Sequence, residues 1–287
     1  MTFSPSDSDF DFVRKVVRED SAIMLDHTKD YLITARLTPL ARREDAASLT
    51  DLLNRVRQGV PRLRRDIVEA LTTNETSFFR DVHPFDALRE HILPSLHETG
   101  RPVRIWSAAS STGQEAYSVA MLIRSSVQHF PPVTILGTDL SGEAVARAST
   151  GRYTQLEVNR GLPARMLVRW FDRDGLTWQV KDELRQMVTF RELNLARPWP
   201  AMPAADVVLL RNVLIYFDLA ARRAVLEQVT RALRPGGFLI LGSAETTYDL
   251  GPRFERVQLG RASCHRLRAQ GAVRHGEPPG NHDERLT

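Results

Sequence analysis

The sequence of 287 residues contains a single cysteine, Cys264, which removes several classes of site. One cysteine excludes an intramolecular disulfide and any zinc or iron–sulfur site that needs several thiolates. The eight histidines show no H-E-x-x-H pattern or other paired ligand spacing. We therefore expect no bound metal.

Long hydrophobic runs are also missing. No stretch of about 18 apolar residues occurs, and the chain starts with a polar, acidic segment where a secretion signal would be basic and then apolar. We expect a cytoplasmic protein with no direct membrane insertion. Hydrophobic residues make up 42% of the chain, which is enough for a core in one large or two ordinary domains.

Neither sign of charge dominates the composition. The 39 lysines and arginines nearly balance the 35 acidic residues, so the formal charge of +4 does not require a nucleic-acid partner, and we expect none. Arginines do gather locally, at positions 36–43, 55–65 and 253–274. Such groups are most often solvated faces, and by themselves they indicate no partner.

The chain divides into two differently patterned regions. Between Phe10 and about Ala70, apolar residues recur every three or four positions, which predicts a small helical domain. From Pro102 onward, short apolar runs alternate with helical stretches, which predicts an α/β fold with a mostly parallel sheet. We place the helical domain and its linker at residues 1–83 and the α/β domain at residues 84–268.

Smaller segments interrupt this pattern. Within residues 151–190, the run from Trp170 to Val180 is typical of two short strands around a turn, which predicts an inserted antiparallel β-subdomain. Leu233–Gly237 is interpreted as a helix exit and turn before a strand at Phe238–Leu241. Residues 269–287 carry glycine, proline and charge with little apolar content, and we expect this tail to be disordered.

The join between the two regions carries the most informative stretch, Thr73-Asn74-Glu75-Thr76-Ser77-Phe78-Phe79-Arg80-Asp81. Its polar side chains can bind a ligand, its phenylalanines can shield a planar ligand from water, and Arg80 can hold a carboxylate or phosphate through two parallel bonds. A capped helix start with two core aromatics explains the same residues. The stretch alone does not decide between a binding wall and a structural segment.

A second informative stretch runs from Arg104 to Glu115 and reads as a strand, a turn of small residues and a helix start. Small residues let the backbone approach a ligand, and amides at a helix start are hydrogen-bond donors. The turn lacks the G-x-G-x-x-G pattern of dinucleotide sites. Glu115 suits a cationic ligand such as S-adenosylmethionine, although an acid is favourable in any first helical turn.

Polar residues also follow three other predicted strands, at the edge where open α/β sheets bind ligands. Asp139 can accept hydrogen bonds from ribose hydroxyls, or it can cap the following helix. Asn194 is a candidate for contact with an adenine edge. Arg211, Asn212 and Tyr216 have no explanation as core residues, so they are further candidates for the site.

In this order the stretches resemble the CheR family, the chemotaxis receptor glutamate O-methyltransferases, which use S-adenosylmethionine. The resemblance runs from about Phe10 to Arg268. Its most specific parts are Asn74-Glu75-Thr76-Ser77-Phe78-Phe79-Arg80, Trp106-Ser107-Ala108 through Thr112-Gly113-Gln114-Glu115-Ala116-Tyr117-Ser118, and Arg211-Asn212-Val213-Leu214-Ile215-Tyr216-Phe217. Gln114 stands where the family usually has an acid and Ala116 where it has a proline, while Glu115 is retained.

The resemblance implies a class I methyltransferase fold, which is Rossmann-like, with the helical domain and the β-subdomain as additions. It implies that S-adenosylmethionine binds and leaves as S-adenosylhomocysteine. In the family, the positions of Arg80 and Tyr216 lie near the transferable methyl, which makes these two residues the catalytic candidates. The family's cofactor-lining positions correspond to Asn74, Thr76, Arg80, Glu115, Asp139, Asn194, Leu195, Arg211 and Asn212.

The resemblance also implies a partner. The family methylates glutamates in the cytoplasmic helices of chemoreceptors and offers them a basic helix, here with Arg36, Arg42 and Arg43. Some members dock a receptor pentapeptide on the β-subdomain, but the short turn Asp172-Arg173-Asp174-Gly175 predicts no such dependence here. Methylation of another substrate and cofactor binding without turnover are the alternative functions.

Overall fold

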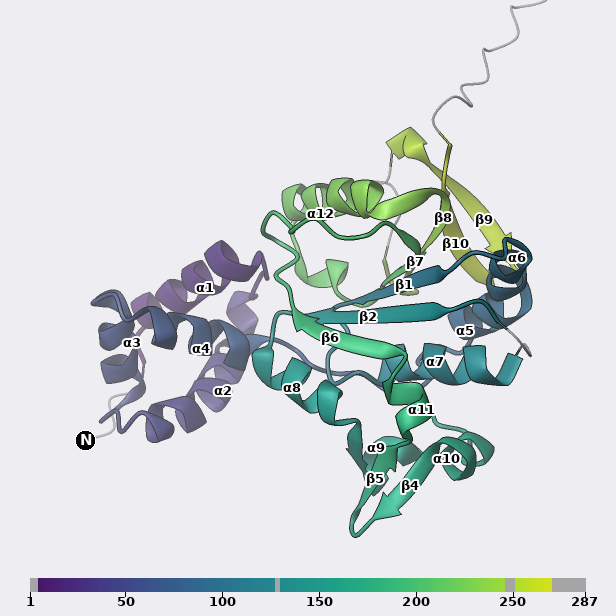
Figure 1. Ribbon diagram of the computed structural model, residues 1–287. Coiled ribbons are helices and arrows are strands. Elements are labelled where there is room, and N and C mark those ends of the chain that lie inside the picture. Colours follow the sequence, from purple (N-terminus) through teal and green to yellow (C-terminus); the bar gives the residue numbers. More distant parts are fainter. Residues whose placement is uncertain (1–4, 127–129, 246–250, 270–287) are drawn as a thin grey trace, which may run out of the picture.

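The computed structural model describes residues 5–126, 130–245 and 251–269, and it places a helical domain beside a larger α/β domain (Figure 1). No helix in these ranges is both long enough and apolar enough to cross a membrane. The tail that we expect to be disordered lies outside the described residues from position 270 onward.

The N-terminal domain is helical, as the spacing of its apolar residues predicts. It contains α1 (Asp7–Ser21), the 3-10 turn η1 (His27–Lys29), α2 (Asp30–Arg43), α3 (Leu49–Arg57) and α4 (Pro61–Leu71). Its buried residues form a core of their own, with Val13, Leu37 and Leu52 among them. Ser6 and Ser48 cap α1 and α3 through their side chains, so local sequence sets these two helix starts.

The α/β domain is built on one mostly parallel sheet with the strand order β6-β2-β1-β7-β8-β10-β9. Its strands are β1 (Val103–Ala108), β2 (Val133–Asp139), β6 (Val188–Glu192), β7 (Ala205–Leu210), β8 (Leu233–Leu241), β9 (Phe254–Leu259) and β10 (Ala262–Leu267). β10 pairs antiparallel with both β8 and β9. The strand order reverses between β1 and β7, which is where open α/β sheets bind ligands.

Helices cover both faces of this sheet (Figure 1). One face carries α12 (Leu219–Ala232), and the other carries α5 (His83–Ala87), the π-helical turn η2 (Leu88–Ile92), α6 (Leu93–Glu98), α7 (Gln114–Ser126) and α8 (Gly142–Thr150). In β1, Ile105 packs into the core on the α7 side and the next residue, Trp106, packs into the core on the α12 side. Alternating side chains of a buried strand therefore fill two cores.

The small antiparallel sheet inserted between α8 and β6 confirms the predicted β-subdomain (Figure 1). Its strand order is β3-β5-β4, with β3 (Arg152–Thr154), β4 (Phe171–Asp174) and β5 (Thr177–Val180). The flanking helices are α9 (Gln155–Asn159), α10 (Ala164–Trp170) and α11 (Asp182–Arg185).

The start of β8 differs from the prediction. The helix exit expected here is confirmed, because α12 ends at Ala232 with Leu233 as its C-cap. The strand begins at once at Leu233, where we expected a turn before a strand at Phe238. Its pairing with β7 shifts register between Ala205 and Val207, and Gly236 has a φ of +79°. An irregular strand therefore takes the place of the expected turn, because pairing with β7 extends past the irregularity.

Candidate active site

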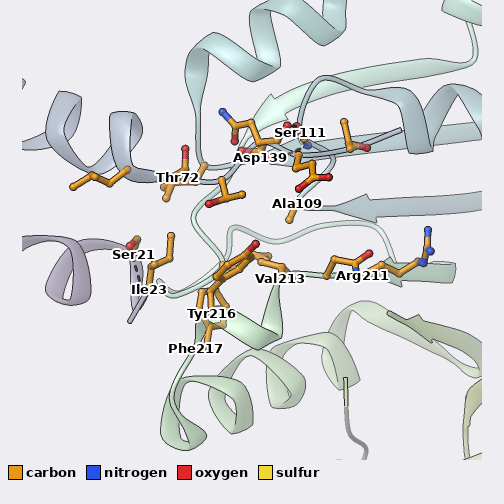
Figure 2. A pocket seen from close by; sticks show the side chains of 18 of the residues that line it. Ser21, Ile23, Thr72, Ala109, Ser111, Asp139, Arg211, Val213, Tyr216 and Phe217 are labelled. Carbon is orange, nitrogen blue, oxygen red and sulfur yellow. Dashed lines mark hydrogen bonds between the residues drawn. The ribbon is translucent and has the colours of Figure 1, made fainter. Parts of the chain in front are cut away.

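The candidate residues meet in a cavity at the carboxyl ends of the central strands, where the helical domain lies against the sheet (Figure 2). Segments of the helical domain, including Ser21, Ile23 and Met24, also line it. The cavity brings together all of the positions proposed for cofactor or catalysis: Asn74, Thr76, Arg80, Glu115, Asp139, Asn194, Leu195, Arg211, Asn212 and Tyr216.

The turn after β1 has a left-handed backbone at several positions. Ala109 and Ser111 have φ values of +57° and +50°, and Gly113 has a φ of +90°. A Cβ at Gly113 would lie 2.9 Å from two neighbouring side chains, so only glycine fits. The Ser111 amide donates to Asp139 Oδ2 (2.7 Å) and its hydroxyl donates to the Asn74 carbonyl (2.8 Å). These bonds tie the turn to β2 and to the linker between the domains.

Asp139 ends β2 with a buried carboxylate. Besides the Ser111 amide it accepts the Ser141 amide at 3.0 Å. Burial raises the pKa of Asp139, while these backbone hydrogen bonds act to lower it. The hydroxyl of Ser141 accepts the Ala144 amide and caps α8, so Asp139 is not the N-cap of that helix. Its carboxylate lies at the cavity wall.

Arg211, directly after β7, connects three parts of the cavity wall. Its side chain is 2% exposed. Its guanidinium donates to Glu115 Oε2 (2.9 Å), Asp81 Oδ2 (2.9 Å) and the Arg80 carbonyl (2.7 Å), while Ser107 donates to Glu115 Oε1 (2.7 Å). Glu115 is therefore not the free anion that the sequence suggests. The Glu115 carboxylate still lies at the cavity wall, where it suits a cationic ligand.

The linker carries backbone strain where it meets this cluster. Phe79, Asp81 and Val82 have φ values of +49°, +67° and +47°. Such conformations are costly for residues other than glycine and are concentrated at functional sites. The strained segment brings Arg80 to the cavity, where its Nη1 donates to the Glu75 carbonyl at 3.0 Å.

The two phenylalanines of the linker do not line the cavity, so the predicted shielding of a ligand by them is wrong. Phe78 is fully buried and packs edge-on against Tyr153 and Phe171 at ring distances of 5.0 and 5.6 Å. Phe79 packs against Phe85 at 5.3 Å. Both rings are core residues, because the β-subdomain and α5 supply apolar partners that the linker sequence does not show.

Tyr216 lies across the cavity from Ser111 and Asp139 (Figure 2). The segment after α1 lies against it, since the Met24 amide donates to the Tyr216 carbonyl (2.8 Å) and Ile23 bridges Phe217. Within the described part of the chain, the Tyr216 hydroxyl has no hydrogen-bond partner. The phenol is therefore available to a substrate.

Two family models match this chain and together span its helical and α/β domains. Residues 8–72 match "CheR methyltransferase, all-alpha domain" and residues 74–262 match "CheR methyltransferase, SAM binding domain". The chain belongs to the CheR methyltransferase family. It is 37% identical over 273 residues to chemotaxis protein methyltransferase 1 of Pseudomonas aeruginosa, covering 92% of this chain and 100% of that protein. It is 38% identical over 269 residues to the chemotaxis protein methyltransferase of Vibrio parahaemolyticus, covering 92% and 98%.

The cofactor of this CheR methyltransferase is S-adenosylmethionine, and the cavity fits its chemistry. The carboxylate of Glu115 in the cavity wall suits the sulfonium and amino groups. Asp139 at the end of β2 suits the ribose hydroxyls, and the small-residue turn after β1 allows close approach of the backbone. Which residue contacts which part of the cofactor stays a prediction.

Asn194 joins the two domains at the wall of the cavity. The Asn194 amide nitrogen donates to the Asp20 carbonyl (2.6 Å) and its oxygen accepts the Ala196 amide (2.9 Å). The side chain therefore holds the end of α1 against the α/β domain, and it keeps a second N–H and a second oxygen lone pair at the cavity. The adenine contact expected for it stays a prediction. Leu195 is buried in the core on the α12 side, with part of it at the cavity.

The three arginines predicted to meet the partner differ in their surroundings. Arg36 is half-buried and donates to two carbonyls at the end of α4, at 3.0 and 2.8 Å. Arg43 is exposed and pairs with two acids at 3.5 and 3.6 Å. Arg42 is exposed, and its side chain has no partner among the described residues. Of the three, Arg42 is the most available for a partner.

Sequence reasoning missed Glu245 and assigned no role to Asp81. Glu245 accepts four backbone amides from the loops after β7 and β8. An acid just past a strand at this edge is the same signal that pointed to Asp139, so Glu245 was detectable. The contact of Asp81 with Arg211 joins positions 130 apart, and no local pattern indicates it.

Proposed function

We propose that this CheR methyltransferase transfers a methyl group from S-adenosylmethionine to the side-chain carboxylates of specific glutamates in the cytoplasmic domain of chemoreceptors. The products are glutamate methyl esters, and the process is sensory adaptation. Both relatives named above are chemotaxis protein methyltransferases, which supports a substrate in chemotaxis.

The bonding of the carboxylates around the cavity carries this proposal. Glu75 pairs with Arg160, Glu115 pairs with Arg211, and Asp139 accepts two amides. No histidine lines the cavity as far as the structure describes it. An amine or hydroxyl acceptor needs a base to take its proton, whereas a glutamate carboxylate, with a pKa of about 4.3, is already ionised at neutral pH. A site whose described lining has no histidine and whose described carboxylates are all engaged therefore favours a carboxylate acceptor.

Arg80 and Tyr216 are the residues that can orient the acceptor. Arg80 uses one guanidinium nitrogen on the Glu75 carbonyl and keeps other donors, and the Tyr216 hydroxyl has no partner in the described residues. Both side chains can donate hydrogen bonds to a carboxylate. S-adenosylmethionine, when bound, supplies an activated methyl group. Alignment of the acceptor with that methyl can contribute about 7 to 11 kcal/mol in favourable cases.

The exposed face of α2 is the proposed contact for the receptor. Arg42 and Arg43 give it positive charge, which complements acidic receptor helices and mainly accelerates encounter. The strands β4 and β5 are joined by a short turn at Gly175 and Leu176, so we expect no dependence on a receptor pentapeptide. Low-micromolar binding of such a pentapeptide in a calorimetric titration would contradict this expectation.

The proposed function is tested by incubating the protein with labelled S-adenosylmethionine and candidate receptor cytoplasmic domains. We expect label that is released by base, and mass mapping of the methyl to glutamates. A receptor domain with those glutamates changed to glutamine is the control and should accept no label. Base-stable label would indicate another acceptor. Cofactor binding without turnover on any candidate would indicate a regulator without catalysis.

A further inference from the structure

Glu245, just beyond β8, binds the ends of two adjacent strands together. Its Oε2 accepts the amides of Gly242 (2.6 Å) and Asn212 (3.0 Å), and its Oε1 accepts those of Val213 (2.8 Å) and Leu214 (2.7 Å). The side chain is half-buried. One carboxylate thus satisfies four backbone donors, three of them in the loop that leads to Tyr216.

That loop has little internal support. Asn212 has a φ of +57°, a conformation that is unfavourable for most residues. The segment that follows is a single 3-10 turn, η3 (Leu214–Tyr216), and its N-cap residue, Val213, provides no side-chain cap. The first amides of any helical turn lack partners within it. The Glu245 carboxylate supplies the missing acceptor, and hydrogen bonds to a charged group are about twice as strong as neutral ones.

The backbone approaches the carboxylate closely at Gly242. A Cβ at Gly242 would lie 2.9 Å from the Asn212 amide nitrogen, from Asn212 Nδ2 and from Glu245 Oε2. Glycine at this position lets β8 end close enough for its amide and the loop amides to share one acceptor.

We propose that Glu245 is a positioning residue for methyl transfer. It holds the Arg211–Tyr216 loop so that Asn212 faces the cofactor cavity and Tyr216 faces the acceptor. The part concerning Tyr216 rests on the function proposed above, while the part concerning Asn212 depends only on cofactor binding.

Glu245→Gln tests this proposal, because it keeps the size of the side chain but replaces one accepting oxygen with an NH₂ group. Two backbone amides then lose their acceptor and face another donor. We expect the Kd for S-adenosylhomocysteine to rise and kcat to fall, each by about 10- to 100-fold. Hydrogen exchange at the amides of Asn212, Val213 and Leu214 should accelerate while exchange in the helical domain is unchanged.

Two further variants keep the test decisive. Glu245→Asp keeps the charge on a shorter side chain, so it should recover part of the affinity and of the turnover even if the glutamine variant folds poorly. Glu255→Gln makes the same chemical change at an exposed position of β9 and should match the wild type. Wild-type Kd and kcat in Glu245→Gln would overturn the proposal, as would reduced thermal stability with no local change in exchange.

The test also separates this proposal from the proposed function. Binding of S-adenosylhomocysteine and amide exchange need no receptor. A wild-type protein that binds S-adenosylhomocysteine but methylates no receptor glutamate would refute the proposed acceptor, and the two measurements would still decide the role of Glu245.

Discussion

Two loops leave the sheet side by side at its carboxyl edge, and each is held by an acid from the next strand. The loop after β1 leads into the long helix α7, and its left-handed Ser111 donates to Asp139 at the end of β2. The loop after β7 leads only into a 3-10 turn, and its left-handed Asn212 donates to Glu245 beyond β8. The first loop therefore donates one amide to its acid, whereas the second donates three.

The two acids also differ in their exposure and in the number of amides that they accept. Asp139 is 7% exposed and accepts two amides, one of them from the loop after β1, whereas the half-buried Glu245 accepts four amides. We infer a division of function between the loops. The first loop binds the cofactor, and the second loop also positions the acceptor carboxylate. The variants below test that division.

Arg211 should give the largest effect, because it begins the second loop and pairs with Glu115 at the start of α7. Arg211→Met leaves Glu115 and Asp81 without their cation. We expect the free energy of unfolding to fall by about 3 to 5 kcal/mol, as for other broken buried ion pairs, measured by urea denaturation. Arg211→Lys keeps the charge and should lose less. Wild-type stability in Arg211→Met would show that the two loops are not linked through this side chain.

Asp139→Asn should weaken cofactor binding and leave the positioning of the acceptor unchanged. The amide can offer only one accepting oxygen to Ser111, Ser141 and the ribose, so we expect the Kd for S-adenosylhomocysteine to rise about 10- to 100-fold by calorimetry. Turnover at saturating cofactor should change much less. A large fall in kcat at saturation would contradict the division between the loops.

The same variant has a pH signature. Burial raises the pKa of Asp139 above its ordinary value of 3.8, so the native state binds this proton more tightly than the unfolded state does. The resulting stabilisation is complete below the unfolded pKa and is lost as pH rises through the raised folded pKa. Because asparagine cannot ionise, the stability of Asp139→Asn relative to the wild type should increase as pH rises above the unfolded pKa of 3.8 and through the raised folded pKa. A decrease over that range would contradict the assignment.

Tyr216→Phe should affect the positioning of the acceptor and leave cofactor binding unchanged. Loss of one hydrogen bond to the attacking carboxylate should lower kcat about tenfold, with the Kd for S-adenosylhomocysteine unchanged. Tyr31→Phe, at an exposed position outside the cavity, is the control and should leave kcat at saturating receptor and the Kd for S-adenosylhomocysteine unchanged. Unchanged turnover in Tyr216→Phe would remove the phenol from the mechanism.

The smallest effect is expected from the arginines of α2, which lie outside both loops. Reversal of Arg42 and Arg43 to glutamate should raise the KM for the receptor domain by about 3- to 10-fold at low salt, and less at high salt, because these charges act through solvent. Arg231→Glu on α12 is a matched control. Cofactor affinity should be unchanged, and a combined loss of affinity and receptor methylation would indicate misfolding.

Much of the fold could be predicted because its signals are local. Periodicity indicated the helical domain, alternating apolar runs indicated the parallel sheet, and the run around Gly175 indicated the β-subdomain. The start of β8 at Leu233 was missed, because proline and two glycines indicate a turn while pairing with β7 keeps the chain extended.

The candidate residues were found by motif, but their bonding was not. The side chain of Asn194 contacts a carbonyl 174 positions away, and Arg211 contacts Asp81 across 130 positions. The amide of Asn194 and the ring of Phe78 have the chemistry of ligand contacts, yet one joins the domains and the other fills the core. No pattern within the linker distinguishes these outcomes.

By itself the sequence determined the helical domain, the order of strands and helices along the chain, the family and the cofactor. Periodicity, caps and motifs depend on residues close together in the chain, so they can be recognised in the sequence. Only the tertiary structure decided that Glu115 pairs with Arg211, that Phe78 is buried, and that Glu245 holds the Asn212 loop. Burial and hydrogen-bond partners depend on segments that folding brings together from distant positions, and they change what each side chain can do.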